Sequence, residues 1–319
     1  MLPRLAFRLL RRPQHASTYA TQGRRSQFAI LTSVQPLVSI VVPVFNGLPH
    51  LRQLTTCLLG QTYPNLEFVF TEGGGSDASF AYLSSIDDSR IRLIQMPQET
   101  SAAGNWTAAT MQARGEFTKL ICQDDLLYPE AVQHQVVDLG DNPNAVMAIA
   151  QRDIVDARGR ILFRRRGLAG LPAQSNIVRG DDVMRACYLQ GTNVIGEPLA
   201  VLFRTNELQE AMPWDDTDPL MLDLSTYQKI APYGDVALRH ESIGAFRVSD
   251  TSWSTRIASE QLDQTKRWQD SFANSQSPPP GLGDRARALL GRHISTNLRR
   301  FAYTSLRIRG RLTPPETPR

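Results

Sequence analysis

The stretch that decides the fold is "LVSIVVPVF", residues 37–45. A continuous run of β-branched and apolar residues is typical of a strand that is buried on both faces of a parallel sheet. The next residues, "NGLPHLRQLTTCLLGQTYPN" (46–65), predict a turn and a helix with Leu51, Leu54 and Leu58 on one side. The ordered part of the chain thus begins with a strand followed by an amphipathic helix.

The alternation of strand and helix continues to residue 122. Further strands are predicted at 67–71, 90–96 and 116–122, and helices at 78–86 and 105–113. This order predicts an α/β fold with a doubly wound, mostly parallel sheet. Ligands of such sheets bind beyond the carboxyl ends of the strands. Polar residues follow the predicted strands at those ends, namely Asn46, Glu72, Asp77, Asp124 and Asp125.

Two adjacent carboxylates stand in "LICQDDLLYP" (120–129), directly after an apolar strand. Like charges this close repel and raise each other's pKa, so Asp124 and Asp125 favour water or a bound cation. One of the two aspartates could instead cap the helix expected in the following residues. A pair at the end of an apolar strand favours a metal site over a cap.

Four segments resemble one protein family in their order and spacing, at residues 38–77, 104–132, 196–204 and 220–254. They include "VVPVFN", "EGGGSD", "ICQDDLLYP" and "LMLDLSTYQK". These segments resemble family 2 of the inverting glycosyltransferases, whose GT-A fold is a Rossmann-like, mostly parallel sheet with helices on both faces. The resemblance implies a GT-A domain at 36–255, with a nucleotide-sugar-binding half at 36–135 and an acceptor half at 136–255.

The same resemblance implies roles for residues at the first strand ends. Pro43, Phe45 and Asn46 would surround the nucleoside. Glu72 would accept a hydrogen bond from an imide N–H of uracil or thymine. Asn105 would bind a phosphate or a sugar hydroxyl, although a helix cap explains this residue equally well.

The acidic pair and an arginine would serve the diphosphate of the donor. The resemblance implies that Asp124 faces the ribose or sugar, that Asp125 holds Mg²⁺ or Mn²⁺, and that Arg247 steadies the diphosphate. A divalent cation held by carboxylates and phosphates offsets the negative charge of the leaving group. The donor is expected to be a UDP-sugar, with dTDP- and GDP-sugars as alternatives, and the acceptor a glycan or lipid-linked saccharide.

An inverting displacement also needs a base that takes the proton of the acceptor hydroxyl. Asp223 stands where the family has this base, and its apolar neighbours would raise its pKa by burial. A helix cap is the structural alternative for Asp223, and Glu197 is the second candidate base. Other carboxylates close in sequence are Asp215, Asp216 and Asp218.

The chain departs from the family pattern at two positions. Gly73 replaces a second aspartate, and Ser249 stands where a histidine often follows the arginine. These departures keep open a nucleotide-sugar-binding module with impaired catalysis. A sugar nucleotidyltransferase is less favoured, because the first loop, "PVFNGLP", is not basic. The "GGGSD" stretch lacks the lysine of a phosphate loop and predicts a tight turn with Asp77 as a local cap.

The two ends of the chain are basic. Six arginines and no acidic residue occupy residues 1–35, which resemble either an organellar transit peptide or a basic arm. Residues 256–319 predict a helical, arginine-rich extension. Its helix could lie on an anionic membrane or pack on the domain with an arginine-lined outer side. Nucleic acid is not an expected partner, since no aromatic platform accompanies the charge.

Composition sets the class and compartment. With 319 residues, 41% hydrophobic and 21% charged, the chain is long enough for one large domain with extensions. Its three cysteines form no CxxC pair, which argues against a thiolate zinc site and favours a reducing compartment. We therefore expect a cytoplasmic protein, peripheral to the inner face of the membrane if the basic helix binds lipid.

Overall fold

The computed structural model describes residues 35–96, 100–250, 252, 255 and 258–313. The predicted basic N-terminal extension and its two interpretations lie outside these residues, except for Gln35. From Pro36 onward the chain forms one compact unit, to which all the elements below belong. None of the described helices is both long enough and apolar enough to cross a membrane.

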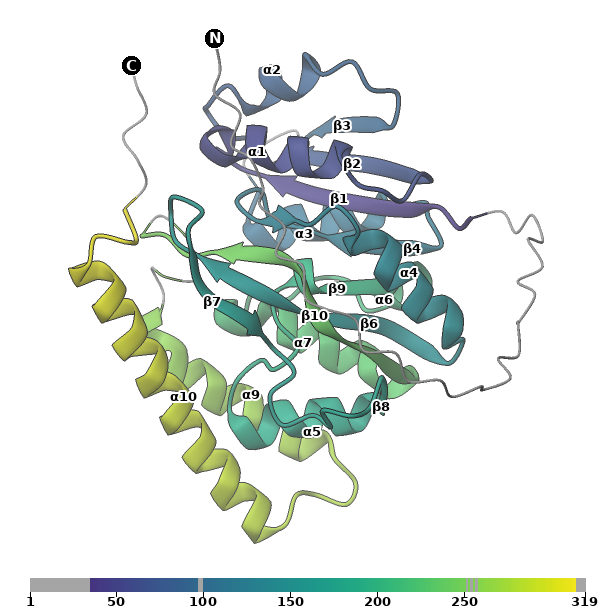
Figure 1. Ribbon diagram of the computed structural model, residues 1–319. Coiled ribbons are helices and arrows are strands. Elements are labelled where there is room, and N and C mark those ends of the chain that lie inside the picture. Colours follow the sequence, from purple (N-terminus) through teal and green to yellow (C-terminus); the bar gives the residue numbers. More distant parts are fainter. Residues whose placement is uncertain (1–34, 97–99, 251, 253–254, 256–257, 314–319) are drawn as a thin grey trace, which may run out of the picture. The chain divides into compact units, whose positions relative to one another are not determined.

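The first half of the sheet is parallel, as the sequence predicts (Figure 1). Strand β1 (Val38–Val44) lies between β2 (Leu66–Glu72) and β4 (Phe117–Leu120), and β2 also pairs with β3 (Ile91–Gln95). All residues of β1, β2 and β4 are buried, which confirms that the apolar runs are strands covered on both faces. Because these strands are parallel, their carboxyl ends meet at one edge.

The second half of the sheet is mixed. Strand β4 pairs antiparallel with β9 (Val201–Arg204), β9 pairs antiparallel with β6 (Ala145–Val155), and β6 pairs parallel with β10 (Asp235–Arg247). Two successive antiparallel pairings restore the direction of β4, so β10 ends at the same edge as β1. Three short strands complete the sheet, β5 (Leu126–Leu127), β7 (Ile161–Arg166) and β8 (Ile177–Arg179).

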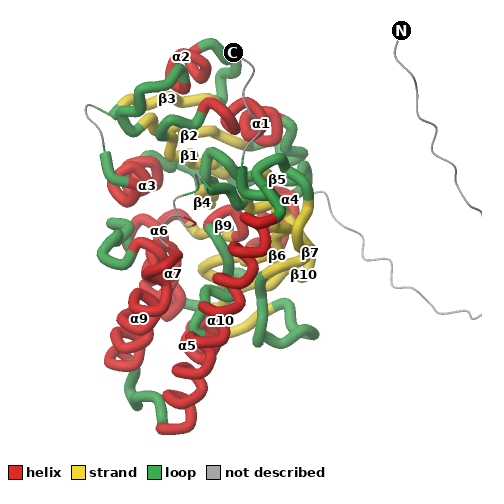
Figure 2. Tube along the Cα trace, turned by 90° about the vertical axis from the view of Figure 1, so that its left-hand side faces the viewer, coloured by secondary structure: helices red, strands yellow, loops and turns green. Residues whose placement is uncertain are grey.

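Helices cover both faces of the sheet, which confirms the predicted α/β class (Figure 2). Successive residues of β1 enter different cores, Val42 on one face and Val41 on the other. The first core takes in α1 (Leu48–Leu59), α2 (Ser79–Ser84) and α4 (Ala131–Asp141). The second takes in α3 (Ala102–Met111), α5 (Gly180–Gln190), α6 (Thr205–Glu210), α7 (Leu222–Ile230) and α9 (Gln261–Ser275). Short 3₁₀ turns lie at Pro198–Ala200, Pro219–Met221, Ala231–Tyr233 and Ala258–Glu260.

The last helix, α10 (Leu282–Ile308), confirms the predicted C-terminal helix and packs along α5 and α9 (Figures 1 and 2). On the side of α10 that faces the domain, Gly291 lies very close to the carbonyl oxygen of Leu189. A Cβ at position 291 would clash with this oxygen. Gly191, just after α5 and with φ at 56°, lies equally close to the backbone of Arg292. These two glycines allow the two helices to approach each other closely.

Replacement of Gly291 by alanine is expected to lower the free energy of unfolding by about 1–2 kcal/mol, because overpacking costs about 1–3 kcal/mol and alanine's helix propensity returns up to about 1. Thermal and denaturant unfolding measure this change. Gly283→Ala is the control, since nothing lies within 4 Å of a Cβ at that position of the same helix. Equal stabilities of the two variants would contradict the close packing at Gly291.

Candidate active site

The loops that follow β1 and β2 fold against each other. Asn46, which has a positive φ of 50°, accepts hydrogen bonds from the backbone N–H groups of Ser76 and Asp77 at 2.8 and 3.1 Å. Asp77 in turn accepts from the N–H groups of Leu48 and Ser79, the first residues of α1 and α2. The predicted role of Asp77 as a local cap is thereby confirmed.

The glycines of "EGGGSD" allow the loop after β2 to approach the loop after β1 closely. Glu72 is buried, and its carboxylate accepts from the N–H groups of Gly74 and Gly75 at 3.2 and 2.7 Å. A Cβ on Gly75 would clash with the backbone N of Asn46, and Gly74 has a φ of 86°. The stretch is therefore a tight turn closed by Glu72, as predicted. The predicted contact of Glu72 with a nucleobase stays a prediction.

Asn105 does not cap a helix. Ser101 is the N-cap of α3 and accepts from the N–H of Gly104, whereas Asn105 lies inside the helix and is buried. Its Nδ2 donates to the carbonyl of Val44 at 3.0 Å, and a Cβ on Gly73 would meet this nitrogen at 2.8 Å. Gly73, where the family has an aspartate, thus makes room for Asn105. Within the described residues Asn105 Oδ1 is buried without a hydrogen-bond partner.

The other residues of the first turn differ in exposure. Pro43 is buried within β1, while Phe45 is 41% exposed at its end. The backbone of Phe45 exchanges two hydrogen bonds of 2.8 Å with the side-chain amide of Gln123. Since Gln123 directly precedes the acidic pair, it ties the turn after β1 to the turn after β4.

Asp124 and Asp125 lie between β4 and β5, and neither caps α4, whose N-cap is Glu130. Asp124 is partly exposed, and its Oδ2 lies 3.5 Å from the hydroxyl of Ser252. Asp125 is 1% exposed, and its Oδ1 accepts from the backbone N–H of Arg247 at 3.1 Å. Burial, followed by repulsion from Asp124, raises the pKa of Asp125 well above its ordinary value.

Arg247 is 2% exposed and binds protein groups on several sides. Its Nε donates to the carbonyl of Asp124 at 2.8 Å, and one terminal nitrogen donates to Gln53 of α1 at 2.8 Å. The other terminal nitrogen lies 3.5 and 3.3 Å from the carbonyls of Asp156 and Ala157. Four of the five guanidinium N–H groups thus have protein acceptors. The predicted contact of Arg247 with a diphosphate stays a prediction.

Asp223 lies in the first turn of α7, not at its N-cap, which is Met221. Its Oδ2 accepts from Nδ2 of Asn193 at 2.9 Å, and its Oδ1 accepts from the N–H of Leu224. Burial and repulsion from Glu197 raise the pKa of Asp223 to about 7, although these two hydrogen bonds act to lower it. A carboxyl group with such a pKa can exchange a proton near neutral pH.

Glu197 has a different environment. Its carboxylate accepts from Nε of Arg152 at 2.6 Å, and Arg152 is itself buried against Gly167 and Gly196. Burial acts to raise the pKa of Glu197, but the charge and hydrogen bond of Arg152 outweigh it and leave the pKa lowered. Glu197 therefore stays ionised and paired, which makes it a weaker base than Asp223.

The thiol of Cys122, just after β4, lies within electrostatic range of four carboxylates of the candidate site. Burial raises the pKa of its thiol well above the ordinary value, and four negative charges add to the effect, those of Asp125, Asp124, Asp223 and Glu197. Asp124, Asp125 and both candidate bases therefore lie within electrostatic range of one thiol, although they are far apart in the sequence.

A divalent cation fits Asp125 in one respect. Its Oδ2 is buried and lacks a hydrogen-bond partner in the part of the chain that the structure describes. A buried, unpaired carboxylate oxygen is costly unless a cation or a proton satisfies it. Among the described residues no group of three or more His, Cys, Asp or Glu side chains could hold a metal ion. Protein ligands alone would thus be few, as in sites where substrate phosphates complete the shell.

Three supporting residues were not predicted from the sequence, Gln123, Arg152 and Asn193. The only sequence feature that could have indicated Gln123 is its position next to the acidic pair. Arg152 interrupts the apolar strand β6, and Asn193 lies in a loop where its Oδ1 accepts hydrogen bonds from the backbone N–H groups of Ile195 and Gly196. No local pattern indicates that these side chains reach Glu197 and Asp223.

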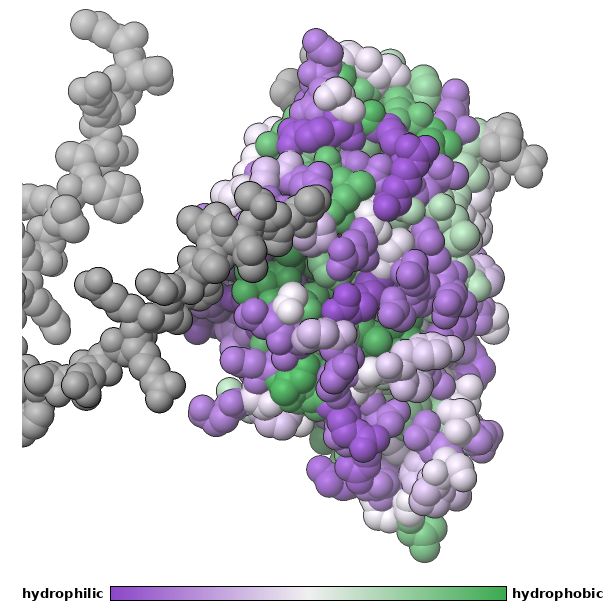
Figure 3. Space-filling view, turned by 90° about the vertical axis from the view of Figure 1, so that its right-hand side faces the viewer, coloured by the Kyte–Doolittle hydropathy of each residue, from purple (hydrophilic) through white to green (hydrophobic). Residues whose placement is uncertain are grey.

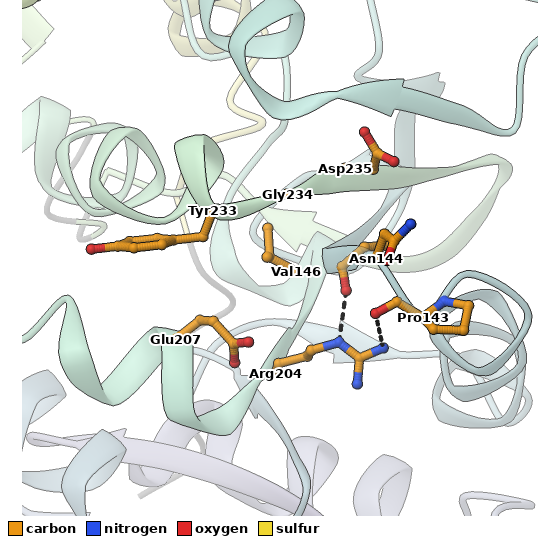
Figure 4. Close-up of a pocket in the computed structure, with 9 residues that line it drawn as sticks. Pro143, Asn144, Val146, Arg204, Glu207, Tyr233, Gly234 and Asp235 are labelled. Atoms are coloured by element: carbon orange, nitrogen blue, oxygen red, sulfur yellow. Dashed lines mark hydrogen bonds between the residues drawn. The ribbon is translucent and has the colours of Figure 1, made fainter.

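A pocket of about 370 Å³ lies at the opposite edge of the sheet, where β6 and β10 begin (Figure 4). It is lined by Glu207, Tyr233 and Asp235, among others. Arg204 is the one cationic residue among the described residues that line it, and its guanidinium donates to the carbonyls of Ala145, Pro143 and Leu139. None of the predicted site residues borders this pocket, so it is not the candidate site.

Comparison with known proteins points to one family. The model of glycosyl transferase family 2 matches residues 39–197, half of the chain. An uncharacterized glycosyltransferase of Rickettsia typhi is 29% identical over 129 residues, covering 40% of each chain. Another of Rickettsia bellii is 32% identical over 143 residues, covering 43% of this chain and 20% of the relative. Succinoglycan biosynthesis protein ExoO of Rhizobium meliloti is 28% identical over 139 residues, covering 43% and 40%. The alignments thus span less than half of these relatives.

Solved structures share the fold. S. aureus TarS 1–349 in complex with UDP-GlcNAc superposes with a TM-score of 0.59 at 12% identity, covering 81% of this chain and 73% of TarS. The mannosyltransferase PcManGT from Pyrobaculum calidifontis, in complex with GDP-Man and Mn²⁺, gives 0.57 at 14% identity, covering 86% and 79%. The predicted GT-A class is confirmed by these likenesses, which at such identities speak for the fold alone. The chain therefore belongs to glycosyltransferase family 2 and has a GT-A fold.

Proposed function

We propose that this protein transfers a sugar from a nucleotide-diphosphate sugar to an acceptor hydroxyl, with inversion at the anomeric carbon. One observation carries the proposal: Asp223, a carboxyl group with a pKa of about 7, lies within electrostatic range of the same thiol, Cys122, as the acidic pair Asp124 and Asp125 at the carboxyl edge of the sheet. Base and leaving-group residues at one edge are what a direct displacement requires.

Asp223 is the proposed base. It takes the proton of the acceptor hydroxyl while that oxygen attacks the anomeric carbon and the bond to the diphosphate breaks. Asn193 donates to Asp223 Oδ2 and holds the carboxylate in position. Glu197 remains paired with Arg152, and its negative charge helps to keep the pKa of Asp223 high.

Asp124 and Asp125 are the proposed donor residues, with Asp124 toward the ribose or sugar. Asp125 would hold Mg²⁺ or Mn²⁺ through its unpaired Oδ2. When bound, such a cation stabilises the negative charge of the leaving diphosphate. Arg247 orients both aspartates through its bonds to Asp124 O and Asp125 Oδ1, and its charge lies beside the proposed diphosphate site.

The nucleoside would lie against Pro43, Phe45 and Asn46, and the unpaired Oδ1 of Asn105 would accept a hydrogen bond from a sugar hydroxyl of the donor. A UDP-sugar is the favoured donor, with dTDP- and GDP-sugars as alternatives. The UDP-GlcNAc of TarS and the GDP-Man of PcManGT support a nucleotide-sugar in this fold. The proposed acceptor is a glycan or a lipid-linked saccharide, and the relative ExoO, named for succinoglycan biosynthesis, supports a role in polysaccharide assembly.

A nucleotide-sugar-binding module with impaired catalysis is the second candidate. Two observations favour it. Asn105 fills the space beside Gly73 where the family has a carboxylate, and the guanidinium of Arg247 is largely engaged with the protein. Such a module would bind nucleotide at the same edge and release no nucleoside diphosphate.

Asp223→Asn is expected to lower the transfer rate by about 10²- to 10⁴-fold, because the base is lost while the shape of the site is kept. Release of nucleoside diphosphate measures the rate, and calorimetric titration with nucleotide is expected to give unchanged affinity. Asp216→Asn is the control, since Asp216 is an exposed carboxylate of a nearby loop. Full activity of Asp223→Asn would exclude Asp223 as the base.

The pH profile reports the ionisation of Asp223. Since its pKa is raised to about 7, the base is protonated below that pH, and kcat/KM should rise through about pH 7 and level off above it. Asn193→Ala removes a hydrogen bond to the ionised form, so the rising limb should move to higher pH. Asn206→Ala, on an exposed side of α6, should leave it in place. A limb that does not move in Asn193→Ala would contradict this assignment.

Asp125→Asn keeps an acceptor for the N–H of Arg247 but loses the charge for a cation. In wild-type protein, Mn²⁺ with UDP should raise Tm more than UDP alone, because a ligand that binds the native state stabilises it. The Mn²⁺-dependent part of this shift should be absent from Asp125→Asn and present in Asp235→Asn, a control at the opposite edge. An equal Mn²⁺ effect in both variants would remove Asp125 from the metal site.

A further inference from the structure

Helix α10 is fixed to the domain along one side. Ser295 Oγ donates to the carbonyl of Gly191 at 2.7 Å, and Arg292 donates to Gln269 of α9 at 3.0 Å. At the start of the helix, Asp284 forms an ion pair with Arg185 of α5 at 2.7 Å. The helix is therefore held in one rotation about its own axis.

This rotation turns the larger apolar side chains of α10 outward. Leu298, Phe301 and Ile308 are 64%, 76% and 81% exposed, and Leu290 and Ile294 are at least half exposed. These five residues, here called the α10 stripe, are spaced by four, four, three and seven positions, which places them on one side of a helix. The sequence pattern predicts an apolar side that includes Leu290, Ile294 and Leu298, but the buried residues of α10 are Ala288, Thr296 and Leu306.

Four exposed arginines lie in or beside the α10 stripe. At 3.6 residues per turn, Arg287 falls within the arc of the stripe and Arg309 directly beside it, whereas Arg300 and Arg307 lie about a quarter turn away on the other side. The one acidic residue in the helix, Asp284, is already paired. An exposed apolar strip accompanied by cations suits a surface that is apolar inside and anionic outside.

Other occupants fit this surface less well. A second copy of the helix would place arginines of one copy next to arginines of the other, and α10 has no free carboxylate that could offset this repulsion. Residues 1–34 of the same chain contain six arginines and no acidic residue, so they would also be repelled. The side of the molecule where β1 begins is mostly hydrophilic, with small apolar patches (Figure 3).

We propose that the α10 stripe and the four arginines in or beside it bind the surface of an anionic lipid bilayer. The apolar side chains enter the region between headgroups and acyl chains, and the arginines contact the anionic headgroups. Binding of this kind depends on both parts, since the apolar area and the charge contribute separately to affinity.

The C-terminal end of α10 brings this surface to the candidate site. Leu306 and Leu312 pack with Val248, which directly follows Arg247. The carbonyls of Arg311 and Leu312 accept from the N–H groups of Ala157 and Asp250 at 3.2 and 3.0 Å. If the proposed transferase function holds, an acceptor anchored in the bilayer would therefore be close to the site. The membrane contact itself does not rest on that function.

Flotation of the full chain with lipid vesicles tests the proposal. Wild-type protein should bind vesicles of phosphatidylcholine with phosphatidylglycerol and should bind pure phosphatidylcholine vesicles far less. The variant L298Q/F301Q should bind the anionic vesicles at least about tenfold more weakly, because it loses apolar area. R287Q/R307Q should lose most of the difference between low and high salt, because its charge is reduced. Both variants alter exposed side chains, so their Tm should match that of the wild type.

M111Q/V137Q is the control, since it replaces two exposed apolar side chains outside the stripe, on α3 and α4. It should bind vesicles as the wild type does. Equal vesicle binding by wild type and L298Q/F301Q would overturn the proposal, since the basic N-terminal segment would then account for the binding. Absence of vesicle binding, with dimers that L298Q/F301Q abolishes in analytical ultracentrifugation, would show that a second copy covers the stripe. Neither result depends on transferase activity.

Discussion

The candidate site depends on the hydrogen bonds by which Arg247, at the end of β10, binds the turn that follows β4. Its backbone N–H and its Nε bind the two aspartates of the acidic pair, and its terminal nitrogens reach α1 and the segment after β6. A guanidinium that is nearly inaccessible to water must keep its donors satisfied, so each of these segments is held in place. A residue of the second half of the chain thereby holds the acidic turn and α1 of the first half in place.

The environment of each acid then determines what it can do. Asp125 is buried with one oxygen unpaired among the described residues, Glu197 is ion-paired with Arg152, and Asp223 is buried beside the negative charge of Glu197. The same carboxyl chemistry therefore yields an unpaired buried oxygen, a paired anion and a group that titrates near neutral pH. Arg152 is central to this division because it fixes the ionised Glu197, and two glycines are needed to admit its side chain.

Local patterns predicted the first four strands, the helices between them and the acidic edge, because burial on both faces leaves a continuous apolar run, as at β1. They did not predict the mixed second half of the sheet. Contacts between residues far apart in the chain are not indicated by any local sequence pattern. The N-cap of α3 is Ser101 and not Asn105, since the helix begins four residues earlier than the amide suggested. The orientation of α10 likewise could not be read from its apolar repeat, because it packs through Gly291 against Gly191 and Leu189, a contact that only the folded chain defines.

Whether this edge of the sheet turns over a nucleotide-sugar can be decided in one assay. Purified full-length protein is incubated with a panel of UDP-, dTDP- and GDP-sugars and Mn²⁺ or Mg²⁺, with and without acceptor saccharides, and the released nucleoside diphosphate is followed. We expect release from one donor, faster with acceptor and abolished by a chelator. Failure to bind any nucleotide of the panel in parallel titrations would show that this edge is not a nucleotide-sugar site.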